Sequence, residues 1–398
     1  MSDARHHVRQ IFEAGVAAAD PYAAVKASVS GVSRPAQIIA VGKAAVQMAK
    51  AALEAFPGVP TRVVTNYENA VDLAGAQVMA AGHPVPDENG AAAAQAILAD
   101  LAACDGPVLA LISGGGSALL PAPVAGVTLA DKARLNSVLL GAGMDITQMN
   151  LVRQQVSRLK GGGLLAAAAP HHVTALILSD VVGDDLSTIA SGPTAPPLGT
   201  AAEAIAVLQA AGVWGAIPAA IQDHLMSDPQ NPALPARENI LVGSNAQSVA
   251  AMRAAAPNAR VLPPVEGDVA QAAVAICEVA ELGTTIWGGE TTVQLKGTGR
   301  GGRNQELALR IAIEARRRGW TDWTCLQGGS DGRDGPTDAA GGLVDHGTLD
   351  RIAGAGGDLA GLLANNDSYA ALALAGDLLM TGATGTNVAD LGVLIRRG

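Results

Sequence analysis

Residues 107–123 read PVLALISGGGSALLPAP, a run of apolar residues that passes directly into three glycines. Such a short, continuously apolar run is typical of a strand buried on both faces of a parallel sheet. Similar runs occur at residues 37–41 (QIIAV), 61–65 (TRVVT), 76–80 (AQVMA) and 173–179 (VTALILS). Alanine-rich stretches with helical character separate them, at 44–56, 88–103 and 129–141. This alternation predicts an α/β fold in which helices are layered on a sheet.

A polar, proline-rich stretch at residues 227–239 (SDPQNPALPAREN) interrupts this pattern and is the best linker candidate. A second series of strand-like runs follows it: NILVGS, ARVLP, TTIWGG, TTVQLK, TCLQGG and LGVLI. A chain of 398 residues is long enough for two hydrophobic cores. We therefore expect two α/β domains, at residues 1–235 and 239–398.

Composition excludes several classes of protein. The net charge is −10, whereas a general nucleic-acid binder needs a basic surface, so no nucleic-acid partner is expected. Cys104, Cys277 and Cys325 form no C-x-x-C pair, which indicates reduced thiols rather than secretion or structural zinc. No run of ~20 apolar residues is present to span a bilayer, and the first twenty residues resemble an amphipathic helix, not a targeting peptide. We expect a cytoplasmic protein with no membrane partner; a homodimer stays open.

The glycine turn after the 107–113 run is the densest candidate site. Gly114, Gly115 and Gly116 let backbone N–H groups approach an anion, and Ser113 and Ser117 add hydroxyl donors. The spacing is not that of a Walker A loop. A tight turn without a ligand is the alternative, but the carboxyl end of a buried strand is where open α/β sheets bind ligands.

Lysine is rare, with six of the 26 basic residues, and three of the six lie at glycine-rich turns: Lys43, Lys160 and Lys296. A flexible ammonium suits phosphate contact from a loop. Lys43, in VGKAA, stands at a helix start, where the helix dipole disfavours a cation unless an anion is nearby. Helical spacing over residues 150–163 would place Arg153, Ser157 and Lys160 on one face, which could equally be a solvated basic face.

Acidic residues follow another expected strand, in SDVVGDDLSTIASGPT (179–194). Asp180, Asp184 and Asp185 suit Mg²⁺, which takes one or two carboxylates together with phosphate oxygens and water. An ordinary surface loop is the alternative. A second acidic loop, GGSDGRDGPTDAAGG (328–342), contains Asp331 and either binds metal, orients a substrate hydroxyl or is a plain turn.

The stretch GGETTVQLKGTGRGGRNQE (288–306) contains G-x-G-x-x-G, which suggests a dinucleotide-binding dehydrogenase. The preceding TTVQLK alternates polar and apolar residues, unlike the buried first strand of that motif. Lys296, Arg300 and Arg303 also concentrate positive charge that suits a triphosphate better. Among the histidines only His83, in AGHPVP, is a candidate, and a satisfied loop residue is the simpler interpretation.

Taken in order, VGKAA, AGHPVPDENG, SGGGSALLPAP, VSRLKGG, SDVVGDDLSTIASGPT, GGETTV, GRGGRNQE and DGPTDAAGG resemble the glycerate 2-kinase family with its MOFRL-type C-terminal domain. The resemblance implies two Rossmann-like α/β domains with an inter-domain active-site cleft. It also implies that ATP and Mg²⁺ convert D-glycerate to 2-phosphoglycerate. The family's functional lysine and arginine fall on Lys43 and Arg303. Gln155, Ser330 and Trp287 depart from the family's usual histidine, threonine and serine.

We therefore expect an ATP-dependent glycerate 2-kinase in which Lys43 and Arg303 act on the transferred phosphate. Residues Ser113 to Ser117 should bind phosphate or the substrate carboxylate, with Lys160 nearby. The expected substrate or metal contacts are Asp180, Glu290 and Asp331, with Asp184 as the metal candidate. Alanine at Lys43 or Arg303 should leave stability nearly unchanged. The alternatives are an NAD(P)H-dependent hydroxypyruvate reductase and a non-catalytic anion-binding protein.

Overall fold

The computed structural model describes residues 3–231 and 233–398, and the chain forms two compact units. One consists of Pro21–Val242 and is called the parallel-sheet unit below. The other combines the described residues up to Asp20 with Gly243–Gly398 and is called the mixed-sheet unit. These bounds differ from the expected division in two places. The first helix belongs to the mixed-sheet unit, and the strand after the proline-rich stretch belongs to the parallel-sheet unit.

The parallel-sheet unit is built on six strands in the order β3-β2-β1-β4-β5-β6, and the pairs from β3 through β5 are parallel. The strands are β1 (Gln37–Val41), β2 (Thr61–Asn66), β3 (Gln77–Ala81), β4 (Val108–Ile112), β5 (Val173–Leu178) and β6 (Arg237–Gly243). Every residue of β1, β4 and β5 is buried, as their continuous apolar sequence predicts. The run NILVGS, expected to open the second series, instead forms most of β6 in this sheet.

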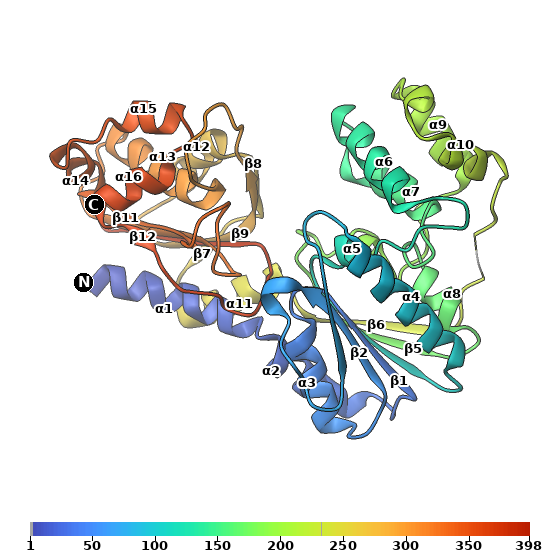
Figure 1. The fold of residues 1–398 in the computed structure, drawn as a ribbon. Helices are drawn as coiled ribbons and strands as arrows, with labels where there is room; N and C mark the ends of the chain where they lie inside the picture. The colour runs from blue at the N-terminus through green and yellow to red at the C-terminus, as the bar shows by residue number, and fades with distance from the viewer. Residues whose placement is uncertain (1–2, 232) are drawn as a thin grey trace. The chain divides into compact units, whose positions relative to one another are not determined.

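Helices of this unit form two groups (Figure 1). The first accompanies the sheet: α2 (Pro21–Ser28), α3 (Ala45–Ala55), α4 (Glu88–Ala103), α5 (Gly116–Leu119) and α8 (Gly163–Ala168). The second packs around its own leucine-rich core: α6 (Leu129–Gly141), α7 (Ile146–Gln155), α9 (Ala201–Ala210) and α10 (Ala219–Met226). Short 3₁₀ turns complete the unit: η1 (Val29–Gly31), η2 (Tyr67–Asn69), η3 (Ile189–Ser191) and η4 (Trp214–Ala216).

Two helix starts in this unit follow from their local sequence. Pro21 is the first residue of α2, and Thr128 forms a capping box with Asp131 at the start of α6. One helical expectation is wrong: α7 ends at Gln155, so Ser157 and Lys160 lie beyond the helix and share no helical face with Arg153. The proline-rich stretch joins α10 to β6 within the unit; Pro232 lies outside the described residues.

The mixed-sheet unit has a seven-stranded sheet with the path β12-β11-β10-β13-β9-β7, and β8 also pairs with β9. Its strands are β7 (Arg260–Val261), β8 (Val265–Asp268), β9 (Gly283–Thr292), β10 (Trp323–Gly329), β11 (Gly341–Asp345), β12 (Leu378–Leu379) and β13 (Asp390–Arg396). Only β7 and β8 run parallel to their neighbour β9; the other pairs are antiparallel. The layered α/β class is confirmed, but this sheet is not Rossmann-like in strand direction. The expected strand TTVQLK is wrong, because β9 ends at Thr292.

Helices cover both faces of this sheet (Figure 1). They are α1 (Asp3–Ala18), α11 (Asn245–Ala255), α12 (Val269–Val279), α13 (Arg303–Arg317), α14 (Thr348–Gly354), α15 (Leu359–Ala364) and α16 (Ser368–Ala375). The amphipathic helix α1 belongs here because it buries Val8, Ile11 and Phe12 in a core shared with α11 and strands β9, β10 and β13. Arg5 ties α1 down further through ion pairs with Asp345 and Asp377.

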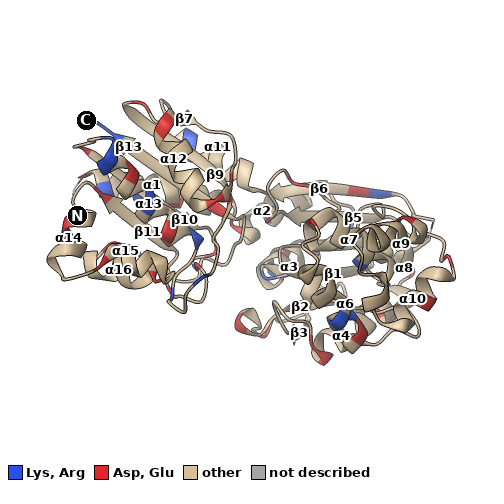
Figure 2. Ribbon diagram, turned by 90° about the horizontal axis from the view of Figure 1, so that it is seen from above, with Lys and Arg blue, Asp and Glu red and all other residues tan. Residues whose placement is uncertain are grey.

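Other expectations concern the composition. The three cysteines are free thiols, and Cys277 and Cys325 are buried. Within 3–231 and 233–398, we find no helix with the length and apolar character that crossing a bilayer requires. Charged residues are scattered over both units, mostly on helices and loops (Figure 2).

Candidate functional site

Strand ends converge in the parallel-sheet unit, where the loop after β1 meets the loop after β4. The amide of Lys43 donates to the carbonyl of Gly114 at 2.9 Å, and the amide of Ala44 donates to Ser113 Oγ at 3.1 Å. Gly42 has φ of +125°, and a Cβ there would lie 2.2 Å from Ser113 Oγ. The turn that carries Lys43 and the glycine turn therefore pack directly against each other, and only glycine fits at position 42.

Gly115 lies between two polar side chains at this edge of the sheet. Its φ is +86°, and a Cβ placed on it would lie 3.2 Å from His83 Cδ2 and 3.3 Å from Lys43 Cγ. Among the described residues, the Lys43 ammonium has no hydrogen-bond or ion-pair partner. Burial and then the charge of Lys43 lower the pKa of His83, and Glu68 opposes this. The side chains of Lys43 and His83 thus flank one glycine.

Asp180 follows β5 and packs against the same loop. A Cβ on Gly114 would lie 2.0 Å from Asp180 Oδ2, so the carboxylate occupies the space that a side chain would need. Burial raises the pKa of Asp180, while a backbone hydrogen bond and the charge of Lys43 act in the opposite direction. Sequence-predicted residues from three separate loops, Lys43, Ser113–Gly116 and Asp180, are therefore close together.

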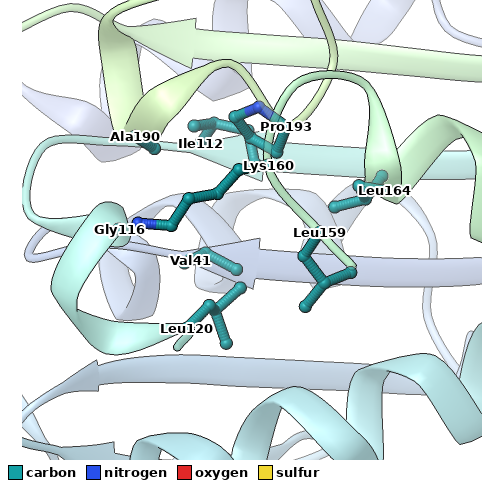
Figure 3. Close-up of a pocket in the computed structure, with 9 residues that line it drawn as sticks. All are labelled: Val41, Ile112, Gly116, Leu120, Leu159, Lys160, Leu164, Ala190 and Pro193. Atoms are coloured by element: carbon teal, nitrogen blue, oxygen red, sulfur yellow. The ribbon is translucent and has the colours of Figure 1, made fainter. Parts of the chain in front are cut away.

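Lys160 supports the glycine turn from within the core (Figure 3). Its side chain passes between apolar residues that include Val41 and Ile112, and its ammonium donates to Ser117 O at 2.8 Å and to Ser117 Oγ at 2.6 Å. Ser117 Oγ also shares a 2.8 Å hydrogen bond with Ser191 Oγ. Burial lowers the pKa of Lys160 well below its usual value. Lys160 is thus placed to hold the start of α5 rather than to meet solvent.

Asp184 is the predicted metal ligand, and its surroundings fit a cation in part. Its Oδ1 is buried without a hydrogen-bond partner, and its φ is +55°. The neighbouring Asp185 instead binds Ser187 and Thr188 within the loop. Across the described ranges no cluster of three or more His, Cys, Asp or Glu residues could hold a metal by itself. The donor set therefore fits only Mg²⁺ that also takes oxygens from phosphate and water.

A second polar cluster surrounds Arg303, the first residue of α13 in the mixed-sheet unit. Its guanidinium donates to Asp390 from Nε at 2.6 Å and from Nη2 at 3.0 Å, and Nη1 lies 3.0 Å from Glu290 Oε1. Burial would lower the pKa of Arg303, but the hydrogen bonds and charge of Asp390 hold it above the usual value. Asp390 itself is 4% exposed in its side chain. The arginine is therefore fixed in orientation before any ligand arrives.

The N-terminal turn of α13 is held by Asp334, which accepts from the amides of Asn304 at 3.1 Å and Gln305 at 2.8 Å. A carboxylate is favourable at a helix N-terminus. Burial raises the pKa of Asp334 to about 6. Asn304 Nδ2 also donates to Asp390 Oδ1 at 2.9 Å, which links both carboxylates through one side chain. Asp331, on the same loop as Asp334, accepts from the amide of Arg333 at 2.9 Å. Burial raises the pKa of Asp390, and the charge of Asp331 adds a smaller contribution in the same direction.

The G-x-G-x-x-G loop in this unit is filled by the protein itself. A Cβ on Gly297 would lie 2.4 Å from Asn365 O, and one on Gly299 would lie 2.5 Å from the same atom. Asn366 Oδ1 accepts from the amides of Lys296 at 2.7 Å and Gly297 at 3.0 Å. These glycines are therefore explained by close packing against residues 365–367, where a dinucleotide would otherwise place its pyrophosphate.

Two of the family departures have structural roles. Trp287 is fully buried in the core of the mixed-sheet unit, and its indole N–H donates to Gln327 at 2.9 Å. Gln155 is buried and donates to the carbonyl of Gly199 at 2.8 Å. Both side chains are therefore fixed by hydrogen bonds inside the fold. Ser330 is buried and accepts from the amide of Val388 at 2.8 Å, beside the loop that carries Asp331.

Sequence reasoning missed Asp390 and undervalued His83. Asp390 is the first residue of β13, so the signal in the sequence was an acid at the start of an apolar run. His83 lies two residues after β3, and the expectation of a satisfied loop histidine did not anticipate Gly115 beside it. The parallel-sheet unit thus offers an unpaired ammonium, glycine amides and an imidazole, which together suit an anionic substrate near a group that loses a proton.

Comparison with known proteins identifies relatives along nearly the whole chain. The family described as a domain of unknown function, DUF4147, matches residues 7–226, and the MOFRL family matches residues 283–390. A D-glycerate 2-kinase from Thermotoga maritima is 39% identical, covering 96% of this chain and 96% of its own. A protein from Agrobacterium vitis, provisionally named a hydroxypyruvate reductase, is 38% identical over 98% of this chain and 94% of its own.

The fold agrees with these matches. The crystal structure of a glycerate kinase from Thermotoga maritima superposes with a TM-score of 0.91 at 36% identity, covering 98% of this chain and 99% of that one. The similarity therefore extends through both units and does not depend on a single motif. This chain belongs to the glycerate 2-kinase family, with a MOFRL region at its C-terminal end.

Proposed function

We propose that this protein transfers the γ-phosphoryl group of ATP to the 2-hydroxyl of D-glycerate, giving 2-phosphoglycerate and ADP. The observation that carries this proposal is the 39% identity to a D-glycerate 2-kinase over 96% of both chains. The site geometry supports it independently, because phosphoryl transfer requires charge neutralisation and positioning more than covalent chemistry. The ATP requirement and the position of transfer are the finer parts of the proposal.

Lys43 supplies the mobile charge in this reaction. Its ammonium has no protein partner among the described residues, so a phosphate oxygen can take that place without displacing a carboxylate. The glycine turn adds backbone N–H groups, and Lys160 holds that turn in place through Ser117. Hydrogen-bond donors that are already fixed in place need little reorganisation when charge develops on the substrate.

Arg303 supplies a fixed charge. Its bonds to Asp390 and Glu290 use one N–H from each of its three nitrogens, so two of its five N–H groups stay available for an anion. A rigidly held guanidinium suits a phosphate, which it can contact through two parallel hydrogen bonds. We propose that this pair of donors stabilises the transferred phosphoryl group.

Magnesium accompanies ATP in this proposal. Asp184, with its unpartnered Oδ1, and Asp180 are the residues that would hold it, together with phosphate oxygens. The ion would neutralise negative charge on the phosphate groups. Free cysteines are consistent with a reducing compartment, so we also propose a cytoplasmic location.

A hydroxypyruvate reductase is the competing function, because one relative carries that name. It would need a dinucleotide loop, and the chain's G-x-G-x-x-G is occupied by residues 365–367. A non-catalytic anion-binding protein is the third candidate, and it differs from the kinase only in lacking turnover.

One assay separates the three functions. Purified protein with D-glycerate, ATP and Mg²⁺ should release ADP, and the product should be 2-phosphoglycerate rather than 3-phosphoglycerate by ³¹P NMR. A parallel sample with hydroxypyruvate and NADH or NADPH should keep its nicotinamide absorbance. Reductase activity without ADP release would support the competing function. Nucleotide binding without either product would support the anion-binding protein.

A further inference from the structure

His83 is a half-buried side chain that the proposed reaction has not yet used. It lies between β3 and α4, where the chain reaches the same sheet edge as Lys43 and the glycine turn. A Cβ on Gly115 would lie 3.3 Å from His83 Nε2 and 3.3 Å from Lys43 Cγ. The Nε2 atom therefore faces the glycine turn from the side where the lysine stem passes.

The loop that carries His83 is fixed by its own contacts. Asp87 caps α4 by accepting from the amide of Gly90 at 2.9 Å, and Tyr67 donates a short hydrogen bond to the same carboxylate. A Cβ on Gly82 would lie 2.5 Å from Val85 O, so the turn is tightly closed. The loop that carries the imidazole is thus held by η2 and the start of α4.

The charges around His83 favour its neutral form. Burial is the main cause that lowers the pKa of the imidazole, and the charge of Lys43, on the loop after β1, lowers it further. Glu68 of η2 raises it. Two further titratable groups lie against this turn: Asp180, on the loop after β5, packs against Gly114, and Lys160 donates to Ser117. The net effect lowers the pKa of His83 from its usual value near 6.5. At neutral pH the imidazole therefore has a free lone pair, which a general base requires.

We propose that His83 is the general base of the reaction, accepting the proton of the substrate hydroxyl at Nε2. This inference rests on the proposed kinase function. The hydroxyl O–H bond breaks as its oxygen forms a bond to the γ-phosphorus of ATP. The bond from that phosphorus to the bridging oxygen breaks, and its electron pair leaves with ADP. The proton on His83 then passes to solvent, which the half-buried ring can reach.

The test compares His83→Gln with His172→Gln. His172 is an exposed histidine just before β5, at the end of that strand opposite to Asp180 and the candidate site. His83→Gln should lower kcat by about 10²-fold with little change in KM, in the range of general-base catalysis. The control should stay at the wild-type rate. In the wild type, kcat should fall as pH drops through the lowered pKa of His83, because protonation removes the lone pair. His83→Gln should lack this acidic limb.

His83→Ala provides the second arm. Added imidazole should restore part of its kcat, and the rescued rate should follow the fraction of neutral imidazole. An unchanged kcat in His83→Gln overturns the inference, and so does a reduced kcat that keeps the acidic limb and resists rescue. If Asp180→Asn abolishes the limb while His83→Gln keeps it, the base is the carboxylate. Because the wild type must first produce phosphoglycerate, failure of the kinase function is seen separately, before any variant is compared.

Discussion

The two candidate clusters differ in whether their cation is paired with a carboxylate. In the mixed-sheet unit, Arg303 is bound by Asp390 and Glu290. In the parallel-sheet unit, Lys43 has no such partner, and only two ion pairs of the described residues lie there, Lys26 with Glu54 and Arg62 with Asp100. Neither pair involves a site residue.

The two cations therefore contribute differently to the stability of the protein without ligand. A paired arginine contributes to the folded state and keeps its orientation, whereas an unpaired lysine contributes little until an anion binds. Removing Arg303 leaves the buried carboxylate of Asp390 without its partner, whereas removing Lys43 leaves no carboxylate unpaired. The same substitution should therefore have different consequences for stability in the two clusters, although both should reduce catalysis.

Arg303→Ala should have the largest effect. Turnover should fall by about 10²–10³-fold, as when a preorganised donor is lost. The free energy of unfolding should drop by about 3 kcal/mol, the low end for breaking a buried pair, because Arg303 is 35% exposed. Kinetics and chemical denaturation measure the two quantities.

A second change isolates the cause of the instability. Arg303→Ala combined with Asp390→Asn should recover most of the lost stability, because the uncompensated charge is gone, but none of the lost turnover. Arg316→Ala, on the exposed end of the same helix, is the control and should leave both quantities near wild type. A stable Arg303→Ala would show that its pairing does not matter for folding.

Lys43→Ala should lower turnover by the same 10²–10³-fold but change the free energy of unfolding by no more than about 0.5 kcal/mol. Lys50→Ala, on the exposed face of α3, is the matched control with unchanged turnover. Thermal melts beside steady-state assays distinguish the outcomes. Loss of stability comparable to that of Arg303→Ala would remove the contrast between the clusters.

Lys132→Met should have the smallest effect on turnover, because Lys132 is not a site residue, and should change only the pH dependence of stability. Burial, with a smaller contribution from Arg153, lowers the pKa of Lys132 to about 7. Between about pH 7 and pH 10 the unfolded chain therefore binds a proton that the folded chain does not, so wild-type stability should rise with pH. The variant should lose up to about 1.4 kcal/mol per pH unit of this slope. Denaturation at pH 7, 8 and 9 measures it, and equal slopes would place Lys132 in water.

Sequence predicted the parallel-sheet unit better than the mixed-sheet unit for a physical reason. Strands β1, β4 and β5 are buried on both faces, so their apolar runs are unmistakable, and the turns after them carry Lys43, Ser113 and Asp180. In the other unit the partners of Arg303 come from β9 and β13, 13 residues before it and 87 residues after it in the chain. Such pairing depends on antiparallel strand order, which local pattern does not reveal.

The structure changes the stability expectation for Arg303 for the same reason. Arg303 lies in a glycine-rich stretch, which suggested that alanine there would cost nothing. The buried Asp390 beneath it changes that expectation, and the sequence gives no sign that these residues meet. The placement of α1 was hidden for a related reason: its apolar face is clear from the sequence, but the sheet that receives it is formed by β9, β10 and β13.

The central proposal is that Lys43 and Arg303 both stabilise the transferred phosphoryl group. A double-mutant cycle on kcat with ATP and D-glycerate tests it most directly. If both cations stabilise one transition state, Lys43→Ala with Arg303→Ala should lose less than the product of the two single losses, because residues that act as a unit are not additive. Losses that multiply fully would mean that the two residues act independently, and the claim would be contradicted.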